Sequence, residues 1–311
     1  MRKININAVN RKIHENQSEF ILSCNKSYEE QLVEIADKIE ADYKTKPILL
    51  LAGPSGAGKT TTAKKIEEIL DNRGINTHTI SMDDYFLPKS SFANAIGEDG
   101  KIDFESPNRI NIPMLNKHME MMSNCEEVTV PKYLFTTQES VDGFKLKRDK
   151  NDIIVFEGIH ALNPMVTSAA SSFARCMYVS VRTRMEFDDN KLLQPKFIRL
   201  MRRLIRDSLY RGRDIAHTLD MFDSVEAGEN KYIMPYKHRA EFSVDTFVPY
   251  EVSVYKNFIL DKLRETAETY PDFERFQLME EVLEATLSVD IDNVPTNSLV
   301  REFIGGSKYS Y

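Results

Sequence analysis

The chain has 311 residues, 41% of them hydrophobic, and a formal net charge of −7 at pH 7. This length supports one large domain or two small ones, each with a real core. The acidic balance argues against a nucleic-acid partner, and no apolar run approaches the roughly 20 residues of a membrane-spanning helix. The N-terminus has no apolar signal-peptide core, and the three cysteines are far apart, so we expect a cytoplasmic protein without disulfides.

Residues 1–46 are predicted to form an N-terminal helical appendage to a domain that spans residues 47–311. Ser27 and Glu30 have the spacing of a capping box at a helix start. An apolar stripe at helical spacing follows, made of Tyr28, Leu32, Ile35, Ala36 and Ile39. We expect this helix to pack on the rest of the chain, and we find no chemistry in it.

The next stretch matches the phosphate-loop pattern G-x-x-x-x-G-K-[ST] in full. A wholly apolar run from Pro47 to Ala52 predicts a buried strand, and an amphipathic helix is predicted from Thr60 to Leu70. Backbone N–H groups of such a loop cradle phosphates at the helix N-terminus. The predicted nucleotide-binding residues are Gly53, Pro54, Ser55, Gly56, Ala57, Gly58, Lys59, Thr60 and Thr61. Lys59 would reach the β- and γ-phosphates, and the Thr60 hydroxyl would hold Mg²⁺.

Strand patterns then alternate with helical ones. Strands are predicted at 75–81, 153–156, 176–181 and 243–248, and helices at 112–122, 195–211, 251–267 and 272–287. We read residues 88–110 as a long surface loop. The alternation predicts an α/β fold with a parallel sheet flanked by helices, of the P-loop NTPase type.

Acidic residues follow two of these strands. Asp83 and Asp84 come after the strand at 75–81, and Glu157 follows the strand at 153–156. The carboxyl ends of parallel strands meet at one edge of the sheet, where ligands bind. A carboxylate there reaches Mg²⁺ directly or through water, so Glu157 and Asp83 are candidate metal ligands beside Thr60. The alternative is that these acids only cap helices.

The predicted helix at 195–211 is strongly basic. Residues 196–213 hold seven basic side chains and one acidic side chain, Asp207. Arg199, Arg202, Arg203 and Arg206 have the i, i+3, i+4, i+7 spacing of one helix face. Arginine suits bidentate contact with phosphate. We predict that residues 195–214 form an Arg-rich lid that closes over the triphosphate, against the alternative of a solvated surface helix.

Other classes of phosphate-loop protein are disfavoured by missing motifs. The chain contains no Asn-Lys-x-Asp for reading guanine and no Leu-Ser-Gly-Gly-Gln of transporter ATPases. A kinase of a small molecule remains, with ATP and Mg²⁺ as its expected cofactors.

At several motifs the chain resembles the uridine kinase branch of the phosphoribulokinase/uridine kinase family. The stretches that carry the resemblance are residues 53–62, 81–86, 103–107, 153–162 and 199–214. The tail at 294–306, Val-Pro-Thr-Asn-Ser-Leu-Val-Arg-Glu-Phe-Ile-Gly-Gly, resembles that of a group of bacterial nucleoside kinases in this branch.

The resemblance implies a role for each matching position. Asp83 would be the base that orients a ribose 5′-hydroxyl, Glu157 would support Mg²⁺, and Lys59 would neutralise charge on the phosphates. The implied nucleoside contacts are Phe104, Glu105, Tyr133 and Arg199, with Glu105 and Arg199 near the ribose diol. Arg202, Arg203 and Arg206 would act from the lid.

The acceptor is the most open part of this interpretation. Family members tend to place an acidic or polar residue after the tyrosine at 133, where this chain has Leu134. The favoured acceptor is a ribonucleoside, uridine or cytidine. The alternatives are another small alcohol, such as a sugar phosphate, and a nucleotide-switched binding protein without an acceptor. A homo-oligomer is compatible with the sequence.

Overall fold

A computed structural model of the chain describes residues 2–97, 100–187 and 191–310. Its centre is a five-stranded sheet in the order β10-β7-β2-β6-β3, in which all neighbouring strands are parallel. These strands are β2 (Ile48–Ala52), β3 (Thr77–Ser81), β6 (Ile153–Glu157), β7 (Ala174–Ser180) and β10 (Phe242–Asp245). The predicted α/β fold with a parallel sheet is confirmed.

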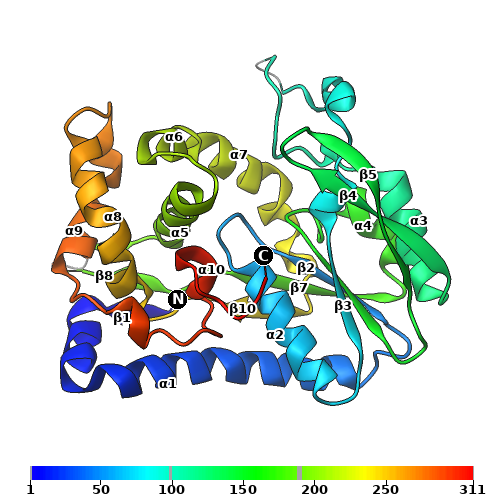
Figure 1. Cartoon of the computed structure of the whole chain (residues 1–311), viewed down its shortest axis with the longest axis horizontal. Helices are drawn as coiled ribbons and strands as arrows, with labels where there is room; N and C mark the ends of the chain where they lie inside the picture. Colours follow the sequence, from blue (N-terminus) through cyan, green and yellow to red (C-terminus); the bar gives the residue numbers. More distant parts are fainter. Residues whose placement is uncertain (1, 98–99, 188–190, 311) are drawn as a thin grey trace.

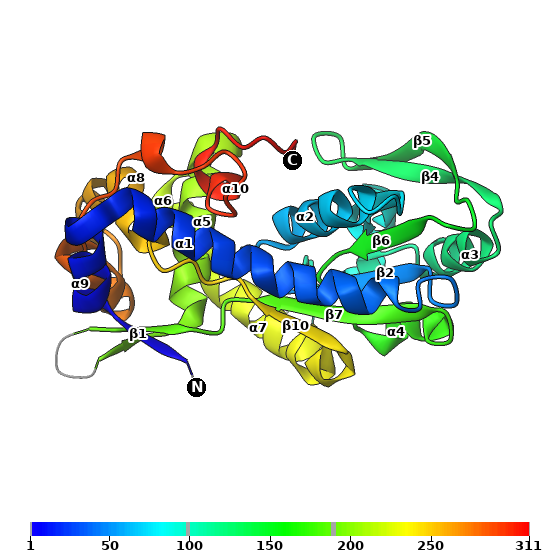
Figure 2. The ribbon, with the colours of Figure 1, turned by 90° about the horizontal axis from the view of Figure 1, so that it is seen from below.

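Helices cover both faces of this sheet (Figures 1 and 2). The described α-helices are α1 (Ile6–Glu40), α2 (Lys59–Asp71), α3 (Ile112–Ser123), α4 (Pro164–Thr167), α5 (Pro195–Tyr210), α6 (Ile215–Asp220), α7 (Phe222–Tyr232), α8 (Glu251–Ala267), α9 (Gln277–Ala285) and α10 (Arg301–Ile304). None of the described helices is long and apolar enough to cross a membrane.

The alternation of side chains along β2 explains why the sheet is covered on both sides. Leu49 and Leu51 belong to one buried cluster with α1, α2, α5 and α8, whereas Ile48 and Leu50 belong to a second cluster with α3 and β6. All five residues of β2 are buried, as its continuous apolar run predicted. The loop that follows β2 is therefore held rigidly at the carboxyl edge of the sheet.

Two smaller sheets lie beside the central one. The strands β4 (Glu127–Leu134) and β5 (Glu139–Lys147) form an antiparallel hairpin with an irregularity between Val130 and Pro131. The strand β1 (Lys3–Asn5) pairs in parallel with β8 (Arg184–Glu186), which pairs in turn with β9 (Leu192–Leu193). The first of these matters for the site, because the β4–β5 hairpin carries Tyr133.

The structure differs from three local predictions in detail. Ser27 caps no helix start, because α1 is one long helix from Ile6 whose backbone is non-helical only at Asn16, and Asn5 caps it. The stretch at 88–110 is not a plain loop: its described part contains the 3₁₀ helices Lys89–Ala95 and Pro107–Arg109. The helix expected at 272–287 begins as a 3₁₀ turn, Phe273–Phe276, before α9.

Candidate active site

The phosphate loop connects β2 to α2 and curls as its glycines allow. Gly56 and Gly58 have φ angles of +74° and +82°, a region that side chains disfavour. A Cβ at Gly56 would also lie 2.8 Å from the carbonyl oxygen of Arg199, so α5 packs directly against the loop. Lys59 Nζ lies 3.4 Å from the carbonyl oxygen of Pro54. This conformation leaves the first N–H groups of α2 as an anion-binding end.

The predicted acids meet beside this loop. Ser81 of β3 pairs in register with Glu157 of β6, and Asp83 is the second residue of the 3₁₀ turn Met82–Tyr85 that follows β3. Burial raises the pKa of Asp83, and Lys59 partly opposes this. Burial also raises the pKa of Glu157 to about 7, with Lys59 acting against it and Asp83 adding to it. Lys59, Asp83 and Glu157 are therefore close enough for their charges to interact.

Glu105 joins the same group from a distant part of the sequence. Burial raises the pKa of Glu105 to about 7, although the Arg203 and Lys59 charges act against it. Its side chain packs against α7, where a Cβ added to Gly228 would lie 2.4 Å from Glu105 Cβ. Glu105 thus faces Lys59 and Asp83, with Arg203 as its cationic neighbour.

The predicted nucleoside contacts are only partly brought together. Arg199 does not join Glu105: its guanidinium donates to the carboxylate of Glu229 at 2.7 and 2.9 Å and to the carbonyl oxygen of Ser55 at 3.1 Å. Phe104 is 52% exposed and packs edge-on against Phe92. The predicted pairing of Glu105 with Arg199 is therefore not formed, and the arginine whose charge interacts with that of Glu105 is Arg203.

Tyr133 lies in an aromatic cluster with Phe86 and Phe135. Its hydroxyl oxygen is buried, with no hydrogen-bond partner among the described residues. The neighbouring acid Asp84 accepts hydrogen bonds from the Tyr133 backbone N–H at 3.2 Å and from Lys132. Asp84 thus connects the β4–β5 hairpin to the turn that follows β3, whereas the charge of Asp83 interacts with that of Lys59.

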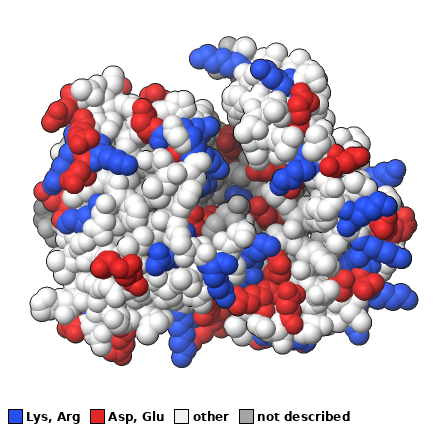
Figure 3. Space-filling model, in the orientation of Figure 1, with Lys and Arg blue, Asp and Glu red and all other residues white. Residues whose placement is uncertain are grey.

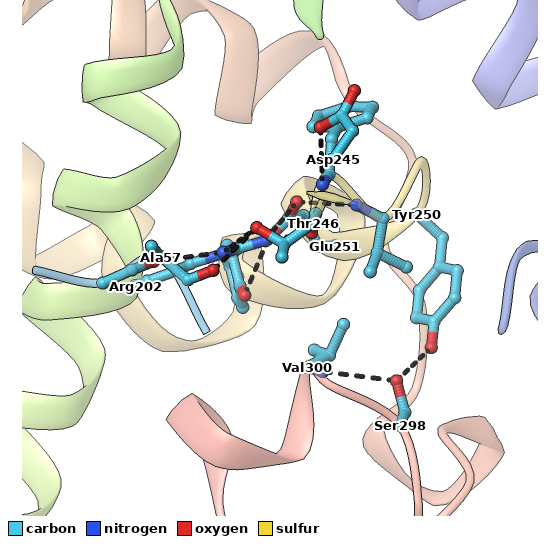
Figure 4. Close-up of polar contacts among 12 residues, drawn as sticks. Ala57, Arg202, Asp245, Thr246, Tyr250, Glu251, Ser298 and Val300 are labelled. Carbon is cyan, nitrogen blue, oxygen red and sulfur yellow. Dashed lines mark hydrogen bonds and ion pairs between the residues drawn. The ribbon is translucent and has the colours of Figure 1, made fainter. Parts of the chain in front are cut away.

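The arginines of α5 have different surroundings although they share a helix. Arg202 is fully buried and donates to both carboxylate oxygens of Glu251, at 2.7 and 3.0 Å. It also donates to the carbonyl oxygens of Gly56 and Thr246 (Figure 4). Arg206 donates to Asp207 at 3.1 Å. This placement favours a structural role for Arg202, beneath the phosphate loop, over the predicted catalytic one.

The remaining packing of α5 bears on the predicted lid. Its apolar residues Ile198, Met201 and Leu204 are buried in the core cluster shared with α1, α2 and α8. A helix held in this way favours a fixed wall of the site over a mobile lid at 195–210. The polar residues that would reach a ligand are then Arg203, whose pKa burial lowers to about 10, and residues just after the helix.

Arg202 gives a prediction about stability. Replacing it with methionine leaves Glu251 as an uncompensated buried charge, and we expect the free energy of unfolding to fall by about 3–5 kcal/mol. Arg206→Met is the control, because Asp207 keeps Arg211 and Arg213 as partners, and its loss should stay near ~1 kcal/mol. Urea denaturation of both variants measures the difference. Equal losses would contradict the assigned role of Arg202.

Four residues near the site were not predicted. His160 is 1% exposed, its Nδ1 has no described partner, and burial lowers its pKa to about 4. The Arg109 guanidinium lies over the rings of Phe86, Phe92 and Phe104. The other two are Arg211, whose charge interacts with that of Asp83, and Tyr232, which donates to Asp103 at 2.7 Å.

The sequence does contain patterns that point to two of these four residues, Tyr232 and Arg211. Tyr232 is the last residue of α7. The apolar residues Ile215 and Leu219 of α6, and Phe222 and Val225 of α7, have helical spacing. Arg211 lies in the basic run that was already recognised. Nothing in the sequence alone indicated that Arg109 would be held by three aromatic rings.

The molecular surface is hollowed between the region of α6 and α7 and that of the β4–β5 hairpin, and charged side chains of both signs surround the hollow (Figure 3). A separate cavity of about 550 Å³ lies beside Pro54. Its cationic lining residues are Arg182, Arg184, Lys196, Arg199 and Lys237. Of the predicted site residues it includes only Pro54 and Arg199, so the acids described above lie outside it.

Comparison with known proteins agrees with this geometry. The model of the phosphoribulokinase/uridine kinase family matches residues 48–253. The chain belongs to this family. The match begins at β2 and ends in α8, so it contains the phosphate loop, the three acids and the arginines of α5.

Relatives in the family are kinases. A uridine kinase of Lactobacillus johnsonii is 27% identical over 201 residues, which cover 64% of this chain and 86% of the relative. Mouse uridine-cytidine kinase-like 1 is 28% identical over 197 residues, 62% of this chain and 32% of the relative. The chain is accordingly a P-loop phosphotransferase, and the kinase family implies the use of ATP.

A solved structure shares the fold. The candidate fructose transport system kinase of Silicibacter sp. TM1040 superposes with a TM-score of 0.52 at 14% identity, covering 68% of this chain and 98% of that protein. At this identity the similarity bears on the fold alone.

Proposed function

We propose that this phosphotransferase moves the γ-phosphate of ATP to the 5′-hydroxyl of a ribonucleoside, with uridine or cytidine favoured. The observation that carries the proposal is the convergence of Lys59, Asp83, Glu105 and Glu157 beside the phosphate loop. Phosphoryl transfer needs charge neutralisation, a metal and an oriented nucleophile, and these four residues can supply all three. Relatives named uridine kinase support the choice of acceptor.

The donor end is assigned to the phosphate loop. Backbone N–H groups from Gly53 to Thr61 would hold the phosphates, and Lys59 would neutralise charge as the γ-phosphoryl group leaves. Lys59 interacts electrostatically with Asp83 and Glu157. The phosphates that Lys59 binds would therefore lie close to these acids. Arg203 and Arg206 are the cations of α5 that we retain for the transferring group.

Mg²⁺ fits the residues present at this end. Mg²⁺ in such sites is typically held by one or two protein groups together with the phosphates. Thr60 offers a hydroxyl, and the buried Glu157 carboxylate, which accepts from Ser81, offers the charge. Asp83 is the other candidate ligand. Bound there, Mg²⁺ would neutralise charge on the phosphate oxygens.

The acceptor end is assigned to Asp83, Glu105 and Tyr133. A general base works best when its pKa lies near the operating pH, and burial moves the pKa of Asp83 in that direction. The Glu105 carboxylate would accept hydrogen bonds from a ribose diol. The Tyr133 ring and its unpartnered hydroxyl would contact the base, and Phe104 would pack at the edge.

One observation favours a second candidate acceptor, a sugar phosphate. Arg109, Arg203 and Arg211 all interact electrostatically with Asp83 or Glu105, and a phosphorylated acceptor needs cations of this kind. The aromatic cluster at Tyr133 favours a flat base instead. The nucleoside stays the preferred acceptor because relatives of this chain are named uridine kinases and an aromatic cluster suits a flat base.

An acceptor panel tests the proposal. ADP release would be measured with uridine, cytidine, adenosine, guanosine, 2′-deoxyuridine and ribulose 5-phosphate at one concentration. We expect uridine and cytidine to be fastest and 2′-deoxyuridine to be slower, since it leaves Glu105 without one of its hydroxyl partners. Turnover of ribulose 5-phosphate alone would overturn the nucleoside proposal and leave the phosphotransferase assignment intact.

The raised pKa of Glu105 gives a pH prediction. Below about pH 7 the carboxyl is protonated and is a weaker acceptor for a diol, so kcat/KM for uridine should rise as pH increases through about 7 and then level off. Glu105→Gln should lower kcat/KM and remove that part of the rise. The measurement is kcat/KM of both proteins between pH 5.5 and 9.

The free energy of unfolding should change with pH in the opposite direction to kcat/KM. Between the ordinary pKa of 4.5 and about 7, the unfolded chain has released the Glu105 proton while the folded chain retains it. The free energy of unfolding must therefore fall as pH rises through this window. Glu105→Gln should show a smaller fall than the unmodified protein. Equal slopes for the two proteins would contradict the buried placement of Glu105.

A further inference from the structure

The C-terminal tail, defined here as residues 294–306, lies against the phosphate loop. The buried hydroxyl of Ser298 is hydrogen-bonded to the Tyr250 hydroxyl at 2.8 Å (Figure 4). The side chain of Asn25 of α1 donates to the same Tyr250 hydroxyl. Val300 and Phe303 are fully buried. The tail is therefore a packed part of the core and not a loose end.

The contact of the tail with the loop is direct. A Cβ added to Gly58 would lie only 2.8 Å from Leu299 Cδ1, so the missing side chain of Gly58 lets Leu299 approach. One turn later, α10 presents Glu302 to the first turn of α2. The Glu302 carboxylate accepts from the Thr61 hydroxyl at 2.6 Å and from the Thr61 backbone N–H at 3.2 Å.

Thr61 occupies a position at which an anion is expected. It is the third residue of α2, and the first four N–H groups of a helix lack partners from a preceding turn. In a phosphate loop, N–H groups at this end cradle the α- and β-phosphates, while the lysine reaches further along the chain of phosphates. A carboxylate that already accepts from Thr61 stands in the position of a phosphate oxygen.

We propose that Glu302 occupies the place of the α-phosphate, so that the nucleotide can bind fully only when this carboxylate leaves Thr61. The inference rests on the proposed role of ATP as donor. Two negative groups sharing one N–H and one hydroxyl repel each other, and the Glu157 carboxylate interacts unfavourably with Glu302 as well. The tail thus makes Glu302 a built-in competitor of the donor.

The side chain of Glu302 can leave without unfolding the tail. The neighbours Val300 and Phe303 stay buried, and Arg301 ties the tail to itself by donating to the carbonyl oxygens of Ile291 and Val294. Rotation about the side-chain bonds of Glu302 is then sufficient. The nucleotide affinity consequently includes the free energy of removing Glu302 from Thr61.

Isothermal titration calorimetry of ADP with Mg²⁺ tests this. We expect Glu302→Gln, which keeps the size and loses the charge, to bind ADP about tenfold more tightly than the unmodified protein, and Glu302→Ala to do the same. The matched control is Glu68→Gln, because Glu68 also accepts from residues near the C-terminus, Lys308 and Tyr309, which follow the tail, but does so beyond the first turn of α2. The control should bind ADP with unchanged affinity.

Lys59→Ala separates failure of this inference from failure of the donor assignment. If Lys59→Ala weakens ADP binding while Glu302→Gln binds ADP equally or more weakly, Glu302 only positions α2 and the competition is refuted. If Lys59→Ala leaves ADP binding unchanged, the donor assignment itself is wrong, and the competition is refuted with it. Urea denaturation would establish that each variant is folded before titration.

Discussion

Asp83→Asn should reduce kcat by about 100- to 10,000-fold while the affinity for ATP stays within a few fold, the range expected for loss of a positioned general base. Asparagine has nearly the same shape but cannot take the proton of the acceptor hydroxyl. As general base the side chain acts on the acceptor, and Thr60 and Glu157 remain to hold Mg²⁺, so the loss should appear mainly in kcat and not in the binding of ATP. Steady-state kinetics with uridine, together with calorimetric titration of ATP, measure both quantities.

The control lies one residue further on. Asp84 holds the Tyr133 backbone N–H and Lys132, so Asp84→Asn should change the position of the β4–β5 hairpin and raise KM for the nucleoside by a modest factor. Its kcat should stay within about tenfold of normal, because no proton transfer depends on it. A larger loss of kcat in Asp84→Asn than in Asp83→Asn would mean that the two acids have been assigned in the wrong order.

Lys59→Ala should reduce kcat by about 100- to 1,000-fold or more, the loss typical when one preorganised charge at a transition state is removed. The Lys59 charge also interacts with those of Asp83, Glu105 and Glu157. Its removal leaves three buried carboxyls without their shared cation, so their pKa values should rise further. ATP binding should weaken as well, because the β- and γ-phosphates lose a partner.

Lys64→Ala is the matched control on the same helix. Lys64 pairs with Glu67, more than one turn of α2 beyond Lys59, and we expect its replacement to leave kcat unchanged. Thermal unfolding of both variants would separate an effect on the transition state from an effect on folding. Near-normal kcat in a folded Lys59→Ala variant would refute the phosphate-loop assignment.

The sheet and the phosphate loop could be predicted because local patterns determine them. The apolar run Ile48–Ala52 has few alternatives to a strand buried on both faces, and Gly56 and Gly58 permit the turn that follows. Asp83 and Glu157 could be placed together because parallel strands end at one edge of the sheet. The phosphate loop follows β2 at the same edge, so the proximity of both acids to Lys59 could also be predicted from this topology.

The tertiary partners of the arginines on α5 could not be predicted. Helical spacing places Arg199, Arg202 and Arg203 near one another, but it says nothing of Glu229 and Glu251, which lie 30 and 49 residues further along the chain. The same charge pattern therefore describes both a lid and a core helix. A buried carboxylate partner decides between these, and only the tertiary structure supplies it.

The contact between the tail and α2 could not be predicted from the sequence either. No property of the residues at 294–306 indicated contact with α2. Glu302 meets Thr61 across 241 residues of sequence. Contacts of this separation follow from how α10 packs on α5, which local propensities do not determine.

Identification of the product tests most directly whether the phosphoryl group goes from ATP to a nucleoside 5′-hydroxyl. Phosphorus NMR of the purified enzyme with ATP, Mg²⁺ and uridine should show a single new phosphomonoester that is coupled to the 5′-methylene protons. Substituting 5′-deoxyuridine should abolish the signal. A phosphate ester at the 2′- or 3′-position, or formation of ADP and inorganic phosphate without any ester, would contradict the claim.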